Sequence, residues 1–128
     1  MTILNKKKIL YMEDDKMLSD IMKRRLEAKG CEVTVAYDGE VGLQRLKEQH
    51  YDILLLDLLM PKIGGFEVLE QLQGSDVLKT TAVFVLSNLG EASDIDRAKS
   101  LGISAFFVKA LATPDSIAMA LGEHFDKS

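Results

Sequence analysis

Four positions along the chain place polar residues directly after short apolar segments, and their types could carry out phosphate chemistry. The clearest is Asp57, which interrupts the apolar stretch 53–60. Because burying an unpaired carboxylate costs several kcal/mol or more, we predict that Asp57 lies just beyond a strand end or is held by a cation. The other apolar segments end before Glu13 and Asp14, before Ser87, and before Lys109.

These residue types suit the transfer of a phosphoryl group. Clustered carboxylates repel one another unless a cation lies between them. Oxygen ligands of this kind suit Mg²⁺, which keeps several waters and accepts phosphate oxygens. An aspartate can act as the nucleophile that carries the phosphoryl group, while a lysine and a hydroxyl stabilise its charge. We therefore predict a Mg²⁺-dependent phosphoryl-transfer site around Asp57.

Alternating strand and helix patterns position these residues. The third and fourth of five strand-like segments are almost entirely apolar, which is typical of a parallel sheet buried on both faces. In such a sheet, ligands bind at the edge where the carboxyl ends of the strands meet. The predicted strands are Lys8–Met12, Glu32–Ala36, Ile53–Leu56, Ala82–Leu86 and Ala105–Val108.

Five helical patterns alternate with the strands, which predicts the α/β class with a doubly wound (βα)₅ sheet. Asp15 can cap the first helix and Gly30 can end it, while Thr113 and Pro114 mark the start of the fifth. The six methionines fall mostly on the apolar faces and are expected in the core. The apolar faces include Leu18, Ile21, Met22 and Leu26 in the first helix, Leu43 and Leu46 in the second, Phe66, Leu69 and Leu72 in the third, Ile95, Ala98 and Leu101 in the fourth, and Ile117, Ala120 and Leu121 in the fifth.

The composition indicates one ordinary globular domain. The 128 residues are 47% hydrophobic and 28% charged, and the net charge of −4 argues against DNA as the main partner. No apolar run approaches the ~20 residues of a membrane helix, and the single cysteine, Cys31, suits a reducing compartment. We therefore expect one cytoplasmic domain over residues 1–128, without an output domain and without a nucleic-acid or membrane partner.

Four motifs follow one another along the chain. They are "KILYMEDD", "DILLLDLLMPKIGGFEVL", "VFVLSNLGE" and "AFFVKA". In this order and spacing they resemble the receiver domain of two-component response regulators, of the single-domain, chemotaxis-regulator-like kind. The resemblance implies a flavodoxin-like fold with the strand order 2-1-3-4-5.

The resemblance also implies a role for each candidate residue. Asp57 would be the phosphoacceptor. Glu13, Asp14, Asp57 and the backbone carbonyl of Leu59 would bind Mg²⁺. Lys109 would pair first with Asp57 and then with the phosphoryl oxygens.

Two further residues would couple phosphorylation to a change of surface. Ser87 would bond to the phosphoryl group, and Phe106 would rotate inward when Ser87 moves. The phosphoryl group would come from the phosphohistidine of a histidine kinase or phosphotransfer protein. A downstream protein would read the surface of the fourth helix, fifth strand and fifth helix, unless the chain acts in a phosphorelay. The chain would then be a signalling switch and not an enzyme, catalysing only its own phosphorylation and slow dephosphorylation.

The sequence departs from the family pattern at some positions near the site. Ala110 stands where the family usually has a proline after a cis bond. A cis bond before a non-proline residue costs about 2.5–4 kcal/mol, so we predict a trans Lys109–Ala110 bond, a reshaped loop, and a lysine that still reaches Asp57. In the family, the positions of Leu59 and Leu89 flank the path of the hydrolytic water, which predicts slow loss of the phosphoryl group.

Three other functions fit the sequence less well. A haloacid-dehalogenase-like phosphatase needs an aspartate two residues after its nucleophile, where this chain has Leu59. A flavodoxin needs a phosphate loop rich in Ser, Thr and Gly, where this chain has "MEDDKM". A degenerate receiver would bind partners without phosphorylation, but the set of acids, hydroxyl and lysine is complete here.

Overall fold

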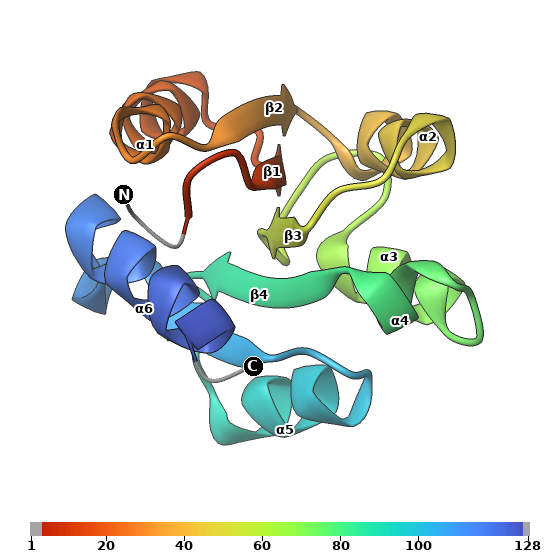
Figure 1. The fold of residues 1–128 in the computed structure, drawn as a ribbon. Helices are drawn as coiled ribbons and strands as arrows, with labels where there is room; N and C mark the ends of the chain where they lie inside the picture. Colours follow the sequence, from red (N-terminus) through yellow and green to blue (C-terminus); the bar gives the residue numbers. More distant parts are fainter. Residues whose placement is uncertain (1–3, 127–128) are drawn as a thin grey trace.

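A computed structural model describes residues 4–126. Within this range five parallel strands form one sheet in the order β2-β1-β3-β4-β5, with helices on both faces (Figure 1). This confirms the predicted α/β class and the flavodoxin-like strand order. The strands are β1 (Lys8–Met12), β2 (Glu32–Ala36), β3 (Ile53–Leu56), β4 (Ala82–Ser87) and β5 (Ala105–Val108).

Two hydrophobic clusters, one on each face of the sheet, hold the helices in place. Helices α1 (Lys16–Ala28) and α6 (Pro114–Asp126) pack in one cluster. The other cluster holds α2 (Gly39–Glu48), α3 (Gly65–Leu72) and α5 (Ala92–Ser100). The sheet is therefore covered on both sides, as the apolar strands require.

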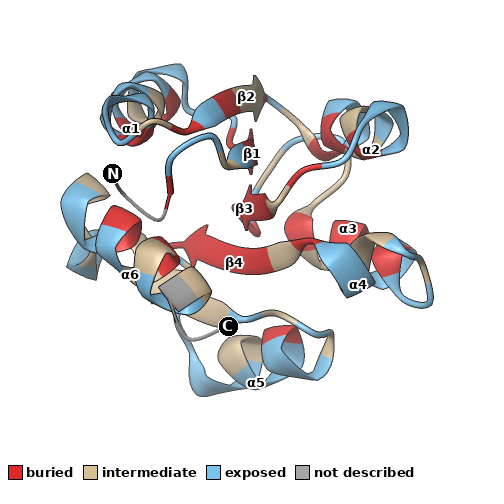
Figure 2. Cartoon of the chain, viewed as in Figure 1, coloured by how far each residue is buried: buried red, intermediate tan, exposed pale blue. Residues whose placement is uncertain are grey.

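The central strand β3 is the most deeply buried part of the sheet. All four of its residues are fully buried, and they alternate between the two clusters (Figure 2). By contrast, every residue of the edge strand β5 is only partly buried. Because β3 lies in the middle of the core, the residue that follows it, Asp57, emerges at a fixed place on the edge of the sheet.

Side-chain caps set the beginnings of the helices. Asp15 caps α1 by accepting a hydrogen bond from the backbone N–H of Leu18 at 3.0 Å. Thr113 Oγ1 accepts one from the N–H of Ser116 at 3.0 Å, directly before Pro114 opens α6. Gly30, two residues after α1, has a φ of 93°, a conformation that favours glycine. The predicted roles of these residues at the helix ends are confirmed.

The structure corrects the predicted pattern in three places. A short additional helix, α4 (Val77–Thr80), precedes β4, because four residues are too few to produce a helical period. The predicted fourth and fifth helices are therefore α5 and α6. Ile21 was expected in the core, but 49% of it is exposed, and Ser19 is buried instead. Met17 and Met119 are also exposed, so the prediction that methionines fill the core was wrong for these two.

The loop after β5 has the predicted trans geometry. No peptide bond between residues 4 and 126 is cis, so the Lys109–Ala110 bond is trans. The chain forms a short 3-10 helix, η1 (Lys109–Leu111), at this point. A search of the described residues for membrane-spanning segments found no helix with the length and apolar character to cross a bilayer.

Candidate functional site

Asp57 lies at the carboxyl end of β3 and is almost completely buried, with 2% of the residue exposed. Its backbone N–H donates to the carbonyl of Met12 in the neighbouring strand β1 at 3.1 Å. Its Oδ1 accepts a hydrogen bond from the N–H of Leu59 at 3.1 Å. The Oδ1 atom of the carboxylate is therefore anchored by its own loop, while Oδ2 faces Lys109.

A single lysine joins two buried carboxylates at this edge. Lys109 Nζ lies 2.8 Å from Asp57 Oδ2 and 2.6 Å from Glu13 Oε1. Glu13 is 0% exposed, and only 16% of the lysine side chain is accessible. The lysine reaches Asp57 from η1 despite the trans bond. Both predicted alternatives therefore hold, since Asp57 lies just beyond the end of β3 and a cation, Lys109, is paired with it.

Burial and pairing change the acid–base behaviour of this cluster. Burial raises the pKa of Glu13 above its ordinary value, the charge of Asp57 adds to this, and the hydrogen bond from Lys109 offsets only part of it. Burial alone would lower the pKa of Lys109, but its two carboxylate partners outweigh that effect and raise it. The lysine is therefore firmly protonated at neutral pH and serves as a fixed positive charge.

Sequence reasoning missed one residue of the site, Tyr11. It is fully buried in β1, and its hydroxyl donates to Glu13 Oε1 at 3.2 Å. Burial raises its pKa above the ordinary value, and the charge of Glu13 raises it further, so the hydroxyl keeps its proton. The two-residue spacing between Tyr11 and Glu13, which places both side chains on one face of a strand, was the signal that could have revealed it.

Three carboxylates form a group that could hold a metal ion. Oxygen atoms of Glu13, Asp14 and Asp57 all lie within 4.8 Å of one another. Asp14 is exposed, so the group is open to water on one side. Hard oxygen donors with access to solvent fit Mg²⁺, which retains part of its hydration shell. The predicted ligand set is thus brought together, while the role of the Leu59 carbonyl stays a prediction.

Ser87 and Phe106 lie on the two neighbouring strands β4 and β5. Ser87 is fully buried at the end of β4, and its Oγ accepts a hydrogen bond from the N–H of Leu89 at 3.3 Å. Phe106 is paired with Val85 in the sheet and packs, half-buried, in the cluster of α3 and α5. Ser87 therefore lies at the same edge as Asp57, whereas Phe106 lies two residues before Val108, the residue of β5 that is paired with Ser87.

A glycine lets α3 begin directly against the acceptor loop. A Cβ atom at Gly65 would lie 2.5 Å from the carbonyl oxygen of Asp57 and 2.7 Å from the Cα of Leu58. Because both neighbours are backbone atoms, neither could move aside without displacing Asp57. Any side chain at this position would therefore disturb the acceptor.

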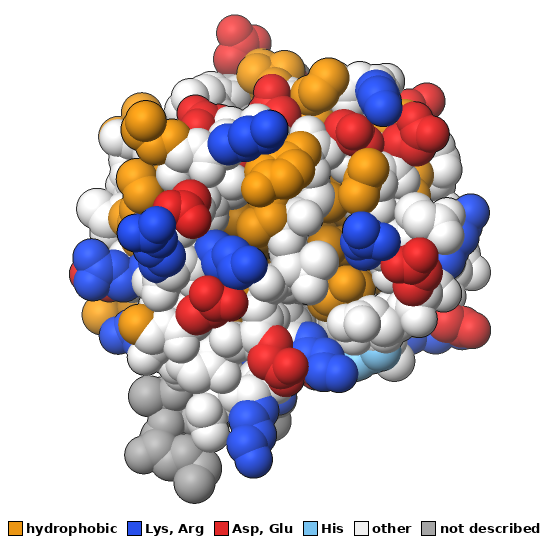
Figure 3. Space-filling view, turned by 90° about the horizontal axis from the view of Figure 1, so that it is seen from above, with side chains coloured by type: hydrophobic (Ala, Val, Ile, Leu, Met, Phe, Trp, Pro, Cys, Tyr) orange, Lys and Arg blue, Asp and Glu red, His pale blue; other side chains and the backbone are white. Residues whose placement is uncertain are grey.

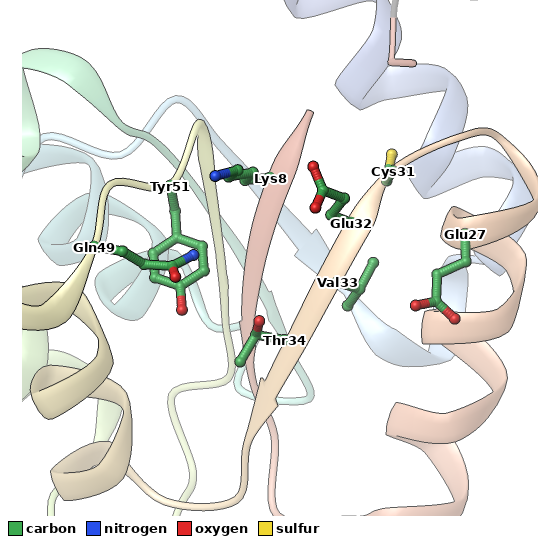
Figure 4. A pocket seen from close by; sticks show the side chains of 8 residues that line it. All are labelled: Lys8, Glu27, Cys31, Glu32, Val33, Thr34, Gln49 and Tyr51. Carbon is green, nitrogen blue, oxygen red and sulfur yellow. The ribbon is translucent and has the colours of Figure 1, made fainter. Parts of the chain in front are cut away.

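A hollow of about 470 Å³ lies at the opposite edge of the sheet and contrasts with this cluster (Figure 4). Its charged residues Lys8, Glu27 and Glu32 are all exposed. Burial raises the pKa of Cys31 to about 11, so its thiol stays protonated near neutral pH and is a poor nucleophile. The residues that the sequence predicted for phosphoryl transfer therefore lie together at the carboxyl edge and not at this hollow.

Comparisons with known proteins point to one family. The family model of the response regulator receiver domain matches residues 9–121. The chain is 35% identical over 107 residues to a probable transcriptional regulator ycf27 of Cyanophora paradoxa, covering 83% of this chain and 43% of that protein. It is 32% identical over 111 residues to the phosphate regulon transcriptional regulatory protein PhoB of Rhizobium meliloti, covering 87% and 49%.

A solved structure has the same fold. The receiver domain of a Francisella response regulator superposes with a TM-score of 0.86 at 25% identity, covering 94% of this chain and 98% of that one. The chain spans about half the length, or less, of the curated relatives it matches. What those relatives share with this chain is therefore the receiver portion.

Proposed function

The chain belongs to the response regulator receiver domain family, which acts in phosphorylation-dependent signalling, and from this premise we propose that Asp57 is its phosphoacceptor. The phosphoryl donor is the phosphohistidine of a histidine kinase or of a phosphotransfer protein. The observation that carries this proposal is a nearly buried carboxylate held by one lysine at 2.8 Å at the open edge of a parallel sheet.

Each residue around Asp57 has its own role in the proposed phosphoryl transfer. A carboxylate oxygen of Asp57 forms a bond to phosphorus as the bond from phosphorus to the donor imidazole nitrogen breaks. Lys109 Nζ moves from the carboxylate to the phosphoryl oxygens and neutralises their charge. The hydroxyl of Ser87 donates a hydrogen bond to one of these oxygens. Glu13, Asp14, Asp57 and the carbonyl of Leu59 would hold Mg²⁺, which would supply further positive charge when bound.

The product stays on the protein, so we infer a switch and not an enzyme with turnover on a free substrate. A phosphatase of the haloacid-dehalogenase kind would need a second aspartate at position 59, where the chain has a leucine. The proposed catalysis is limited to the chain's own phosphorylation and its slow reversal.

The proposed output surface consists of α5, β5 and α6. Two features support it. Strand β5 lies at the edge of the sheet and is only half-buried along its whole length. Leu111, at the end of the η1 turn that connects β5 to α6, leaves 85% of its surface exposed. In this proposal Ser87 moves toward the phosphoryl group, Phe106 on β5 rotates inward in response, and a downstream protein reads the change.

Phosphorylation by acetyl phosphate with Mg²⁺ tests the acceptor. We expect one phosphoryl group per chain by mass spectrometry in the wild type and none in Asp57→Asn. Asp52→Asn is the matched control, because Asp52 lies at the opposite end of β3, where its side chain accepts a hydrogen bond from the N–H of Lys8 at 2.8 Å. Equal labelling of the Asp57→Asn variant, or an unlabelled wild type, would contradict the proposal.

A further inference from the structure

Tyr11 has a polar group at the proposed Mg²⁺ site, although its ring belongs to the apolar core. It is 0% exposed, and it packs in the cluster of α1 and α6. Its hydroxyl donates to Glu13 Oε1 at 3.2 Å. This hydrogen bond takes no part in the proposed phosphoryl transfer.

The hydrogen bonds of Glu13 are distributed unequally between its two oxygens. Oε1 accepts from Tyr11 and from Lys109 Nζ, which lies at 2.6 Å. Among the described residues, Oε2 accepts only from the N–H of Asp15, at 3.2 Å. Since a carboxylate has about four acceptor positions in all, Oε1 is fully used, whereas Oε2 has one position left.

We propose that Tyr11 is a positioning residue for Mg²⁺ binding: its hydroxyl fixes the Glu13 carboxylate so that Oε1 holds Lys109 and Oε2 remains free for the cation. This inference rests on the proposed function, which places Mg²⁺ at Glu13, Asp14 and Asp57. A glutamate has one more rotatable bond than an aspartate, so its carboxylate needs a second anchor to be held in one orientation. Donors that orient a metal ligand in this way raise the affinity of the site.

The variant Tyr11→Phe removes the hydroxyl and keeps the ring in the core. We expect the Kd for Mg²⁺, measured by isothermal titration calorimetry, to rise about tenfold. The rate of phosphorylation by acetyl phosphate should return to the wild-type maximum once Mg²⁺ is saturating, because Tyr11 acts on the cation through Glu13 and not on the reaction itself. Tyr51→Phe is the matched control, since Tyr51 is also buried, at 2% exposure, but lines the hollow at the opposite edge.

A double-mutant cycle separates positioning from packing. In a Glu13→Gln background, Tyr11→Phe should raise the Kd for Mg²⁺ no further, because the residue through which it acts has changed. NMR of the wild type with isotope-labelled tyrosine gives a test without any variant: Mg²⁺ should shift the signal of Tyr11 and leave that of Tyr51 in place.

Some results would overturn the inference. An unchanged Kd in Tyr11→Phe, an equal tenfold loss in the Glu13→Gln background, or a Tyr11 signal that ignores Mg²⁺ would each do so. A wild type that binds Mg²⁺ but accepts no phosphoryl group would instead contradict the proposed function. In that case the effect of Tyr11 on Mg²⁺ affinity would still be measured, so the two failures are distinguishable.

Discussion

Charged side chains are buried at one edge of the sheet and exposed to water at the other. At the carboxyl edge, Glu13 and Asp57 are buried and share one lysine. At the amino edge, Lys8 and Glu32 start their strands exposed to water, beside the hollow of about 470 Å³. The charges beside the hollow are those of an ordinary protein surface, whereas the buried charges at the carboxyl edge belong to the residues proposed for phosphoryl transfer.

The difference follows from what surrounds each charge. On the face that α1, β2 and α2 form, side chains of both signs lie among apolar ones at the surface (Figure 3), and the charged residues that line the hollow are exposed. Water screens such charges, so each contributes little. At the carboxyl edge the charges are removed from water, so losing the partner of any one of them should destabilise the folded protein strongly. Matched changes at the two edges should therefore have very different effects.

The largest difference is expected from the two lysines. Lys109→Met leaves Glu13 and Asp57 buried without a cation, which should cost about 3 kcal/mol of unfolding free energy near neutral pH. Lys8→Met at the amino edge should change it by less than about 0.5 kcal/mol, since the residue is exposed. Urea unfolding measures both. Similar losses in the two variants would mean that burial does not distinguish the two edges.

Leu59 and Leu89, at the positions expected to flank the path of the hydrolytic water, should affect how long the phosphoryl group persists. Leu59 and Leu89 cannot orient a hydrolytic water, so the wild type should lose the group about tenfold more slowly than a Leu59→Asn, Leu89→Glu double variant, a difference of about 1.4 kcal/mol in the barrier. Leu59 is 54% exposed and Leu89 is only partly buried, so neither substitution replaces a fully buried side chain.

Loss of the phosphoryl group is followed by mass spectrometry with Mg²⁺ and without a partner. Leu111→Asn is the control, because Leu111 is an exposed leucine at neither of the two positions that flank the path of the hydrolytic water. If the double variant and the wild type lost the group equally fast, the two leucines would not set its lifetime.

The sequence was sufficient to predict the positions of Asp57, Ser87 and Lys109. Asp57 and Lys109 directly follow apolar strands, and Ser87, predicted to follow β4, is its last residue. Parallel strands bring their carboxyl ends to one edge, so strand boundaries alone place these residues to within one position. Tyr11 could not be found in this way, because within an apolar strand it resembles any aromatic core residue. Its importance depends on the direction of a single hydroxyl, which the pattern of apolar residues does not encode.

Some local features escaped prediction for a related reason. Helix α4 (Val77–Thr80) is too short to show a period. Ile21 lies on the apolar side of a helical pattern, yet the sheet and α6 leave that part of α1 uncovered, and 49% of it is exposed. Periodicity indicates which residues can face a core, whereas the extent of the neighbouring elements decides which of them do.

The pH dependence of stability should also differ between the edges. The pKa of Glu13 is raised in the folded state, so its contribution is fully present below the ordinary value near 4.5 and is lost as pH rises through the raised value. Glu13→Gln cannot ionise and should therefore lose less stability than the wild type between about pH 4.5 and 7. Glu32→Gln, at the exposed edge, should follow the wild type.

Unfolding free energies of the wild type, Glu13→Gln and Glu32→Gln, measured at about pH 4.5 and pH 7, test this expectation. A Glu13→Gln variant whose stability changed with pH as much as that of the wild type would show that the carboxyl of Glu13 ionises as freely as an exposed one.

The smallest effect is expected from the ion pair between α1 and α6. Arg25 Nε lies 3.4 Å from Asp115 Oδ1, but 54% and 65% of the two side chains are exposed. Water competes for both charges, so Arg25→Gln should cost less than about 1 kcal/mol, and salt should reduce the loss further. A urea titration of this variant at low and high salt provides the check. The contrast between the buried site and the surface assumes that the exposure of the two partners sets the strength of an ion pair. If Arg25→Gln cost as much unfolding free energy as Lys109→Met, this assumption would be wrong for this protein.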